Sequence, residues 1–400
     1  MPRSLLFVVL LCGSPAALAA EKMVAGKKVV PPGSVTYDKG LVMKSAEGDF
    51  LMRTNLRMQT RYEFADVQLP GESEHERERE MAFEVYRLRL EFTGHAVSEA
   101  VQYAVVTEWG KGAVALKDGY IDWNFAGPVR LRSGQFKRPF SRQQLTSDWK
   151  GALVDRAIVD KAFGNGRDVG LMLHNNYTKS PTLEWAAGVF NGTGDGAVTS
   201  GVATVDPATG VGEISEVSSS NVPGHMHPML VARLGMNIGE IDGYDEIDFQ
   251  GKTGGGIALN LLADLDNEHD GSPDDGLMRV GLDFIAKAQG FSTTGGYFME
   301  RQQVGAQWSD QDPTQDGLYV QAAWQKAERF ILAARYAAVL PHETRLTGDL
   351  SSNELTMGPS LLWNKHDLRW TSEVSLQTHN VGPGQPEKAT IVRSQLALQL

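Results

Sequence analysis

The chain has 400 residues and a formal net charge of −11 at pH 7. This negative balance argues against non-specific nucleic-acid binding, which needs an excess of Lys and Arg. Forty-three glycines and one cysteine suit a protein with many strands and turns and no disulfide framework, and an ordinary soluble all-β protein is the alternative that these numbers leave open.

The first nineteen residues have the pattern of a secretory signal peptide. Arg3 supplies a positive charge, residues 5–11 form an apolar core, and Ala17-Leu18-Ala19 is a small-x-small cleavage site. The only cysteine, Cys12, lies in this segment, so the mature chain would carry no cysteine. The mature chain also lacks an apolar run of the roughly 18 residues that a membrane helix needs. A membrane location would therefore require a β-barrel.

Residues 50–64 alternate between two kinds of side chain. The even positions are apolar or threonine, and from Arg53 onward the odd positions are polar. A period of two indicates a strand whose faces meet different surroundings. At ~3.3 Å per residue this strand would be about 50 Å long, which exceeds the usual strand of a soluble protein. A long strand with an apolar face and an arginine-bearing face is typical of a transmembrane β-barrel.

The same alternation returns along the chain. In residues 81–94 it predicts that Tyr86 and Leu88 share an apolar face, opposite Arg87 and Arg89. Further strands are predicted at residues 97–109, 118–125, 129–132, 168–176, 182–190, 230–238, 253–265, 278–284, 291–301, 317–326, 330–336, 354–364, 368–377 and 392–400. Terse connections such as Gln289-Gly290 alternate with long polar ones such as residues 191–227, as in an outer-membrane barrel.

These strands predict an all-β fold, a transmembrane antiparallel barrel of about sixteen strands. We expect a signal peptide over residues 1–19, a periplasmic segment over 20–48 and the barrel over 49–400. Side chains cannot fill a barrel of this width, so its interior must hold water and form a channel.

The arginines on the polar faces are expected to face the lumen, because a lipid-facing Arg at mid-depth costs about 2–4 kcal/mol. The residues predicted to line the pore are Arg53, Arg57, Arg61, Arg87, Arg89, Arg130 and Arg132. Two roles stay open for them: a ladder that favours anions, or partners for nearby carboxylates. The candidate carboxylates are Glu63, Glu91, Asp118 and Asp122.

Residues 134–168 break the alternation and carry a cluster of cations. A loop here, after the fifth strand, could fold inward and narrow the pore, and Arg or Lys at a constriction favours anions. Its expected cations are Lys137, Arg138, Arg142, Lys150 and Arg156. The alternative is that they pair at the rim with Asp148, Asp155, Asp160 and Asp168.

Four segments resemble the phosphate-selective porin O and P family. The most specific is the run Gly134-Gln135-Phe136-Lys137-Arg138-Pro139-Phe140-Ser141; the others are residues 40–45, 166–170 and 188–192. The resemblance covers most of the mature chain in the same order and spacing. It implies a sixteen-stranded, trimeric porin that sits among outer-membrane lipid and lipopolysaccharide and passes small anions such as phosphate.

Other motifs fail on inspection. Gly251-Lys252-Thr253 is not a phosphate-binding loop, because Glu246 stands where a glycine is required. The acidic residues 264–271 lack the glycine and the closing glutamate of a calcium loop, and His225 and His227 have no carboxylate support. We therefore expect no metal, cofactor or nucleic-acid partner.

The sequence thus predicts a passive outer-membrane channel for small hydrophilic solutes, leaning to anions, and not an enzyme. Two alternatives stay open. A barrel hydrolase would need His174, His342 or His379 beside a nucleophile or an acid. A structural barrel would have a plugged lumen and no conductance.

Overall fold

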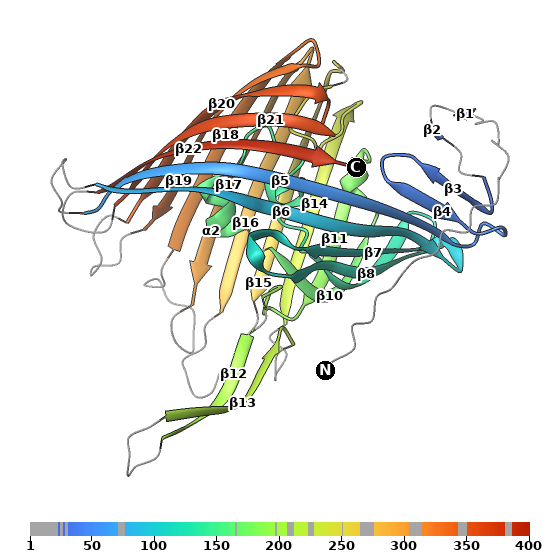
Figure 1. Ribbon diagram of the computed structural model, residues 1–400, viewed down its shortest axis with the longest axis horizontal. Helices are drawn as coiled ribbons and strands as arrows, with labels where there is room; N and C mark the ends of the chain where they lie inside the picture. Colours follow the sequence, from blue (N-terminus) through green and yellow to red (C-terminus); the bar gives the residue numbers. More distant parts are fainter. Residues whose placement is uncertain are drawn as a thin grey trace, which may run out of the picture.

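The computed structural model describes residues 23–24, 27–28, 31–70, 77–164, 166–196, 198–205, 212–222, 228–249, 251–264, 276–303, 314–342, 350–380 and 386–400. Within these residues, sixteen antiparallel strands close into a barrel (Figure 1). They are β5 (Leu51–Gln68), β6 (Glu78–Ala96), β7 (Ser98–Glu108), β8 (Ala115–Ala126), β9 (Val129–Lys137), β10 (Arg167–His174), β11 (Leu183–Phe190), β14 (Met229–Gly239), β15 (Gly254–Asp264), β16 (Leu277–Ala288), β17 (Phe291–Gln302), β18 (Thr314–Lys326), β19 (Phe330–Pro341), β20 (Ser352–Asn364), β21 (Leu368–His379) and β22 (Glu387–Gln399). The predicted fold class is confirmed.

The barrel closes where the last strand meets the first. Strand β22 pairs antiparallel with β5, and Leu398 lies opposite Met58. The last residue joins the same seam, because the Leu400 N–H donates to the Leu56 carbonyl at 2.9 Å. Closure gives each of the sixteen barrel strands a partner on both sides.

Shorter elements extend the sheet or stand apart from it. Strands β3 (Ser34–Tyr37) and β4 (Leu41–Lys44) form a hairpin that hydrogen-bonds to the start of β5. Strands β12 (Val198–Val205) and β13 (Gly212–Ser220) form a hairpin that extends away from the barrel, within a connection that the sequence indicated only as long and polar (Figure 1). The remaining elements are β1 (Met23–Val24), β2 (Lys27–Lys28), α1 (Arg142–Leu145), α2 (Ile158–Phe163) and the 3₁₀ turns at Gly110–Gly112 and Tyr177–Lys179.

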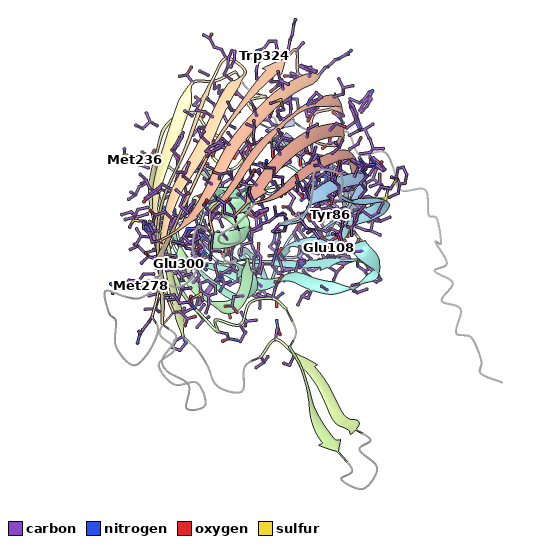
Figure 2. The ribbon with its side chains drawn as sticks, turned by 90° about the vertical axis from the view of Figure 1, so that its left-hand side faces the viewer. Tyr86, Glu108, Met236, Met278, Glu300 and Trp324 are labelled. Carbon is purple, nitrogen blue, oxygen red and sulfur yellow. The ribbon has the colours of Figure 1, made fainter. Side chains whose placement is uncertain are left out.

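The period of two separates the outer face of the wall from its lumen face. Along β16, Val280, Leu282 and Phe284 are exposed on the outside, while Asp283 between them is fully buried inside the barrel. Figure 2 shows Met236 and Trp324 at the outer edge of the barrel in the same way. An outer face of Leu, Val, Met and aromatic side chains is what lipid requires.

The two ends of the barrel carry different connections. At one end, which we call the short-turn rim, β16 and β17 are joined by Gln289 and Gly290 alone. Both residues have positive φ (51° and 85°), the backbone of a tight hairpin turn that matches the twist of its strands. The opposite end, the long-loop rim, carries the long connections after β9, β11 and β17.

The predicted signal peptide, the pair His225 and His227, and most of the acidic segment 264–271 lie outside the described residues. In the part of the chain that the structure describes, no helix is long and apolar enough to cross a membrane.

Candidate functional site: the barrel lumen

All seven predicted arginines lie on lumen faces of the strands, and each contacts a carboxylate. The pairs, measured between a guanidinium nitrogen and a carboxylate oxygen, are Arg53–Asp38 (3.1 Å), Arg57–Glu91 (3.2 Å), Arg61–Asp155 (2.9 Å), Arg87–Asp148 (3.5 Å), Arg89–Glu108 (2.6 Å), Arg130–Asp122 (2.6 Å) and Arg132–Asp122 (2.6 Å). Of the carboxylates considered from the sequence, Glu91 and Asp122 are partners of these arginines, Glu63 lies 3.7 Å from Arg61, and Asp118 pairs instead with Arg167. The arginines thus form a row whose charge is largely balanced within the barrel.

The expectation that Tyr86 shares the outer face with Leu88 is wrong. A β-bulge between β5 and β6 places Gln59 opposite Arg87 but Thr60 opposite Val85, so Tyr86 is the extra residue. A bulge inserts one extra residue into one strand, so the side chains before it and those after it alternate out of phase. Tyr86 consequently turns into the lumen, where the Arg61 guanidinium lies 3.3 Å from the centre of its ring. Its hydroxyl contacts Asp155 at 3.5 Å.

The predicted inward loop is present between β9 and β10. We call residues 138–166 the constriction segment; helices α1 and α2 belong to it, and it lies inside the barrel (Figure 1). Its apolar side chains pack on the inner wall: the ring of Phe140 is tilted against that of Phe298 of β17 and the ring of Phe163 stacks on it, with centres 5.8 and 5.9 Å from that of Phe298. The segment is therefore held against the wall by an apolar core that occupies part of the lumen.

Polar contacts fix the constriction segment to strands far apart around the barrel. Arg142 is buried and binds Asp283 of β16 at 3.0 Å and Glu184 of β11 at 3.4 Å. Near the middle of the segment, the Val154 N–H donates to Glu373 of β21 at 2.8 Å. The segment thus crosses the lumen from one side of the wall to the other.

The five cations predicted at the constriction have different surroundings. Arg138 contacts Asp168 at 3.4 Å, Lys150 pairs with Asp242 at 2.7 Å, and Arg156 pairs with Asp148 at 2.7 Å. Arg142 binds Asp283 and Glu184 of the wall, as described above. Lys137 has no carboxylate partner among the described residues; its ammonium donates to the carbonyls of residues 144, 145 and 146 at the end of α1.

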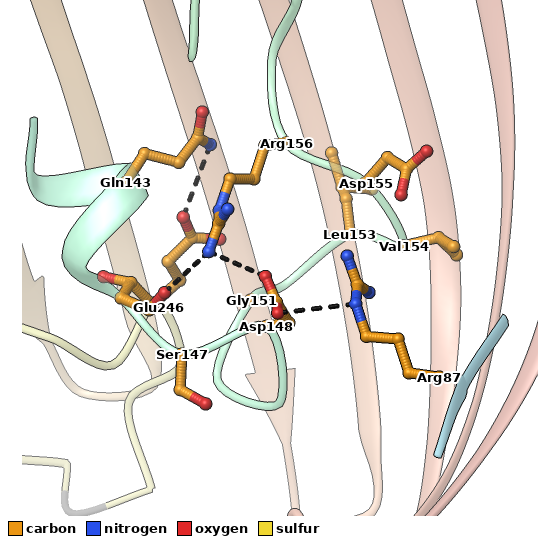
Figure 3. Close-up of a pocket in the computed structure, with 11 residues that line it drawn as sticks. Arg87, Gln143, Ser147, Asp148, Gly151, Leu153, Val154, Asp155, Arg156 and Glu246 are labelled. Carbon is orange, nitrogen blue, oxygen red and sulfur yellow. Dashed lines mark hydrogen bonds and ion pairs between the residues drawn. The ribbon is translucent and has the colours of Figure 1, made fainter. Parts of the chain in front are cut away.

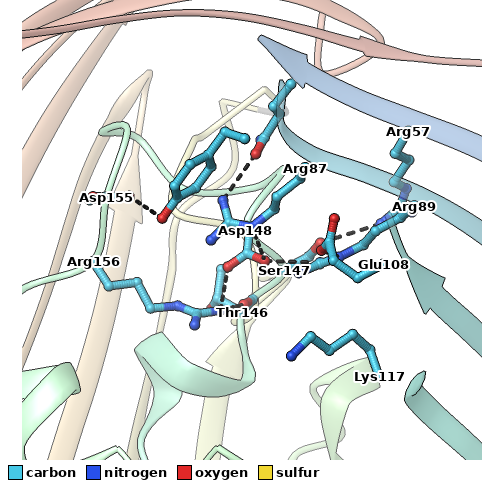
Figure 4. A network of polar contacts seen from close by, with 12 residues as sticks. Arg57, Arg87, Arg89, Glu108, Lys117, Thr146, Ser147, Asp148, Asp155 and Arg156 are labelled. Carbon is cyan, nitrogen blue, oxygen red and sulfur yellow. Dashed lines mark hydrogen bonds and ion pairs between the residues drawn. The ribbon is translucent and has the colours of Figure 1, made fainter. Parts of the chain in front are cut away.

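Two carboxylates of the constriction segment face the arginine row (Figures 3 and 4). Asp148 lies 2.9 Å from Arg89 and 3.5 Å from Arg87, and Asp155 lies 2.9 Å from Arg61. Burial would raise the pKa of Asp148, but Arg156, Arg87 and Arg89 hold that pKa well below its usual value. The pKa of Asp155 is lowered in the same way: burial would raise this pKa, but the positive charges of Arg61 and Arg393 outweigh that effect. Both are fixed negative charges that bridge segment and wall.

A second inward segment, residues 240–249 between β14 and β15, was not expected from the sequence. We call it the inward turn, because it starts from the short-turn rim and contacts the constriction segment. The Glu246 N–H donates to the Lys150 carbonyl at 3.0 Å, and the Glu246 carboxylate accepts from the Ala152 N–H at 2.9 Å. The available signal was a long connection with apolar Tyr244 and Ile247 at a rim where other turns are terse.

The space left between the constriction segment and the wall includes a basic cavity of about 280 Å³, bounded by strands β5 to β10. Five cations and two carboxylates line it; Arg89 and Arg132 are also paired with Glu108 and Asp122, which lie outside the lining, so part of this positive charge is compensated. The cations are Arg57, Arg89, Arg132, Lys137 and Arg167, and the carboxylates are Glu91 and Asp118. We call this space the basic cavity.

The histidines considered for a hydrolase contact single polar partners. His174 lies 3.1 Å from Asp122, His342 lies 3.1 Å from Asp316, and His379 lies 2.9 Å from the Ser352 hydroxyl. Across the described ranges, none of these contacts joins a nucleophile, a histidine and an acid in series. The described part of the chain contains no group of three His, Cys, Asp or Glu residues that could hold a metal ion.

Solved structures of outer-membrane proteins share this fold. The outer-membrane channel DcaP of Acinetobacter baumannii superposes with a TM-score of 0.56 at 12% identity, covering 90% of this chain and 99% of DcaP. A loop-deletion mutant of OmpT, an outer membrane protein of Vibrio cholerae, gives 0.53 at 10% identity, covering 87% and 99%. The trimer form of OmpT gives 0.52 at 10% identity, covering 86% and 99%. At such identities the likeness establishes the fold.

A comparison with curated protein sequences finds no match. The sequence does match a family model, phosphate-selective porin O and P, over residues 54–332. The match spans most of the barrel, including the arginine row from Arg57 onward, the constriction segment and the inward turn, and it confirms the resemblance that the sequence motifs suggested. With the closed barrel, it supports a porin role in the outer membrane. The chain belongs to the phosphate-selective porin O and P family.

Proposed function

We propose that this protein is a passive diffusion channel for small hydrophilic solutes that prefers anions such as phosphate. The observation that carries the proposal is the basic cavity, where five cations and two carboxylates face one space of about 280 Å³. Fixed positive charge along a narrow path lowers the energy of an anion there and raises that of a cation. Because the wall arginines are paired with carboxylates, we expect a moderate preference for anions and not their exclusive passage.

The test is the reversal potential of the full chain, refolded and inserted into a planar bilayer, in a potassium chloride gradient. We expect a potential of the sign that marks chloride as the more permeant ion. The double variant Arg57→Glu, Arg87→Glu should lower the chloride-to-potassium permeability ratio several-fold, because both side chains face the constriction. A cation-selective wild-type pore would overturn the proposal, and a pore that never conducts would favour the structural barrel.

The matched control is Lys326→Glu, which makes the same change of charge at an exposed position at the end of β18. Its reversal potential should equal that of the wild type. Heat-dependent migration in gels should show that all variants are folded, so that a change in selectivity reports on the lumen.

We also propose that residues 1–19 are removed as a signal peptide, that residues 20–48 lie in the periplasm, and that the barrel works as a homotrimer in contact with lipid and lipopolysaccharide. A trimer form has been solved for OmpT, whose barrel has the same fold. Light scattering of the detergent-extracted protein, corrected for bound detergent, should give three chains per particle. A mass of one chain at native concentration would contradict the trimer.

A further inference from the structure

One side of the basic cavity departs from the polar lumen expected of a water-filled barrel. Ala104 and Val106 occupy successive lumen positions of β7, and the ring of Tyr120 follows on β8. Phe136 of β9 completes this side, with its ring centre 6.0 Å from that of Tyr120. Lumen positions of a porin wall usually carry polar side chains. The cavity therefore has a compact apolar wall in addition to its cations.

The opposite side carries positive charge that carboxylates do not fully compensate. The Nε atom of Arg57 is buried and, among the described residues, makes no hydrogen bond. Lys137 lines the same cavity; its ammonium donates to three backbone carbonyls and has no carboxylate partner among the described residues, so it contributes positive charge to the cavity. Positive charge of this kind favours an anionic group in the cavity.

We propose that the basic cavity selects small organic anions, namely a carboxylate joined to one compact apolar ring, over inorganic anions. This inference rests on the proposed anion channel and names its preferred solute class. A carboxylate would be attracted by the positive charges of Arg57 and Lys137, while the ring would displace water from Val106 and Tyr120. Inorganic phosphate would satisfy the cations but leave the apolar wall facing water. A cavity of about 280 Å³ lies just below the range that holds drug-sized ligands, which limits the solute to about one ring.

The test measures how four solutes block the chloride current of the full chain in a planar bilayer. Acetate and benzoate carry the same charge but differ in apolar body, benzyl alcohol keeps the ring without the charge, and phosphate supplies charge alone. We expect benzoate to half-block at a concentration about tenfold lower than acetate or phosphate, since it alone engages both walls. Benzyl alcohol should not block. Equal potency of benzoate and acetate, or a stronger block by phosphate, would overturn the inference.

Two neighbouring valines provide a matched pair of variants. Val106→Thr replaces a methyl of the apolar wall by a hydroxyl with little change of shape, and should weaken the benzoate block about threefold while leaving the acetate block unchanged. Val105→Thr makes the same change on the outer face, where Val105 is 40% exposed. Benzoate should block this variant at the same concentration as the wild type. Equal benzoate potency in both variants would also count against the inference. If Val106→Thr does not fold, the wild-type solute series decides alone.

The two proposals fail in different ways. A cation-selective wild-type pore removes the anion channel and this inference with it. An anion-selective pore in which benzoate, acetate and phosphate block alike removes only the preference for an organic anion.

Discussion

Neighbouring residues of a barrel strand meet opposite solvents, and Leu88 and Arg89 of β6 illustrate the consequence. Arg89 is 7% exposed and bound to two carboxylates inside the barrel, while Leu88 lies on the outer face. Leu88→Arg would place a guanidinium on the lipid-facing side of the wall, about halfway along β6. We expect this variant to lose about 2–4 kcal/mol of unfolding free energy, measured by urea titration in lipid vesicles.

Thr93→Arg is the control for introducing an arginine into β6. Thr93 lines the basic cavity, so the new guanidinium would face the lumen and meet water. Leu88→Met keeps the outer face apolar and should change stability little. If Leu88→Arg and Thr93→Arg were equally stable, the assignment of the two faces of β6 would be wrong.

Asp148 is the residue whose charge most directly opposes the arginine row (Figure 4). Asp148→Asn keeps the shape of the side chain and removes one fixed negative charge beside Arg87, Arg89 and Arg156. We expect the chloride-to-potassium permeability ratio to rise several-fold, because these cations would no longer be neutralised by the protein. Reversal potentials measure it, and Asp316→Asn, at a side chain bound to His342 near the long-loop rim, is the control. An unchanged ratio would show that the ions pass elsewhere.

At the scale of an element, the constriction segment depends on Arg142 for its hold on the wall. Asp283 and Glu184 keep Arg233 as a partner at 2.7 and 3.1 Å, so Arg142→Ala should leave the barrel folded. The segment itself would lose charged hydrogen bonds worth roughly 1.5–3 kcal/mol. We expect larger and noisier single-channel conductance, because the segment would move away from β16.

Lys150→Ala is the matched control for Arg142→Ala, since it removes a cation of the same segment whose side chain is 38% exposed. An exposed pair contributes at most about 1 kcal/mol, so conductance should stay near that of the wild type. Identical traces for Arg142→Ala and the wild type would mean that the apolar core alone holds the segment.

For the whole molecule, the ion pairs between segment and wall set how acid affects stability. The pKa of Asp148 and that of Asp155 lie below their usual value of 3.8, so their contribution is fully present above that pH and is lost as the pH falls through the lowered values. The difference in unfolding temperature between the wild type and the double variant Asp148→Asn, Asp155→Asn should therefore be constant from pH 7 to about pH 4. It should shrink only below pH 4. A difference that already vanishes between pH 7 and pH 5 would contradict this ionisation.

The sequence by itself determined the barrel and the side of the wall on which each long run of residues lies. Alternation with a period of two needs no knowledge of partners, because adjacent side chains of a strand point to opposite faces. It also indicated the inward loop, since residues 134–168 lack that alternation. The pattern misled at Tyr86, where a bulge adds one residue, so that the outer positions of β6 are odd-numbered up to Val85 and even-numbered from Leu88 onward.

Only the tertiary structure decided which charges meet inside the barrel. Arg61 and Asp155 are 94 residues apart in sequence, and Arg142 and Asp283 are 141 apart. Such pairs depend on how the constriction segment and the inward turn cross the lumen, and no local spacing encodes that path. The basic cavity exists for the same reason: its cations come from four strands, and its walls form only when the barrel is closed.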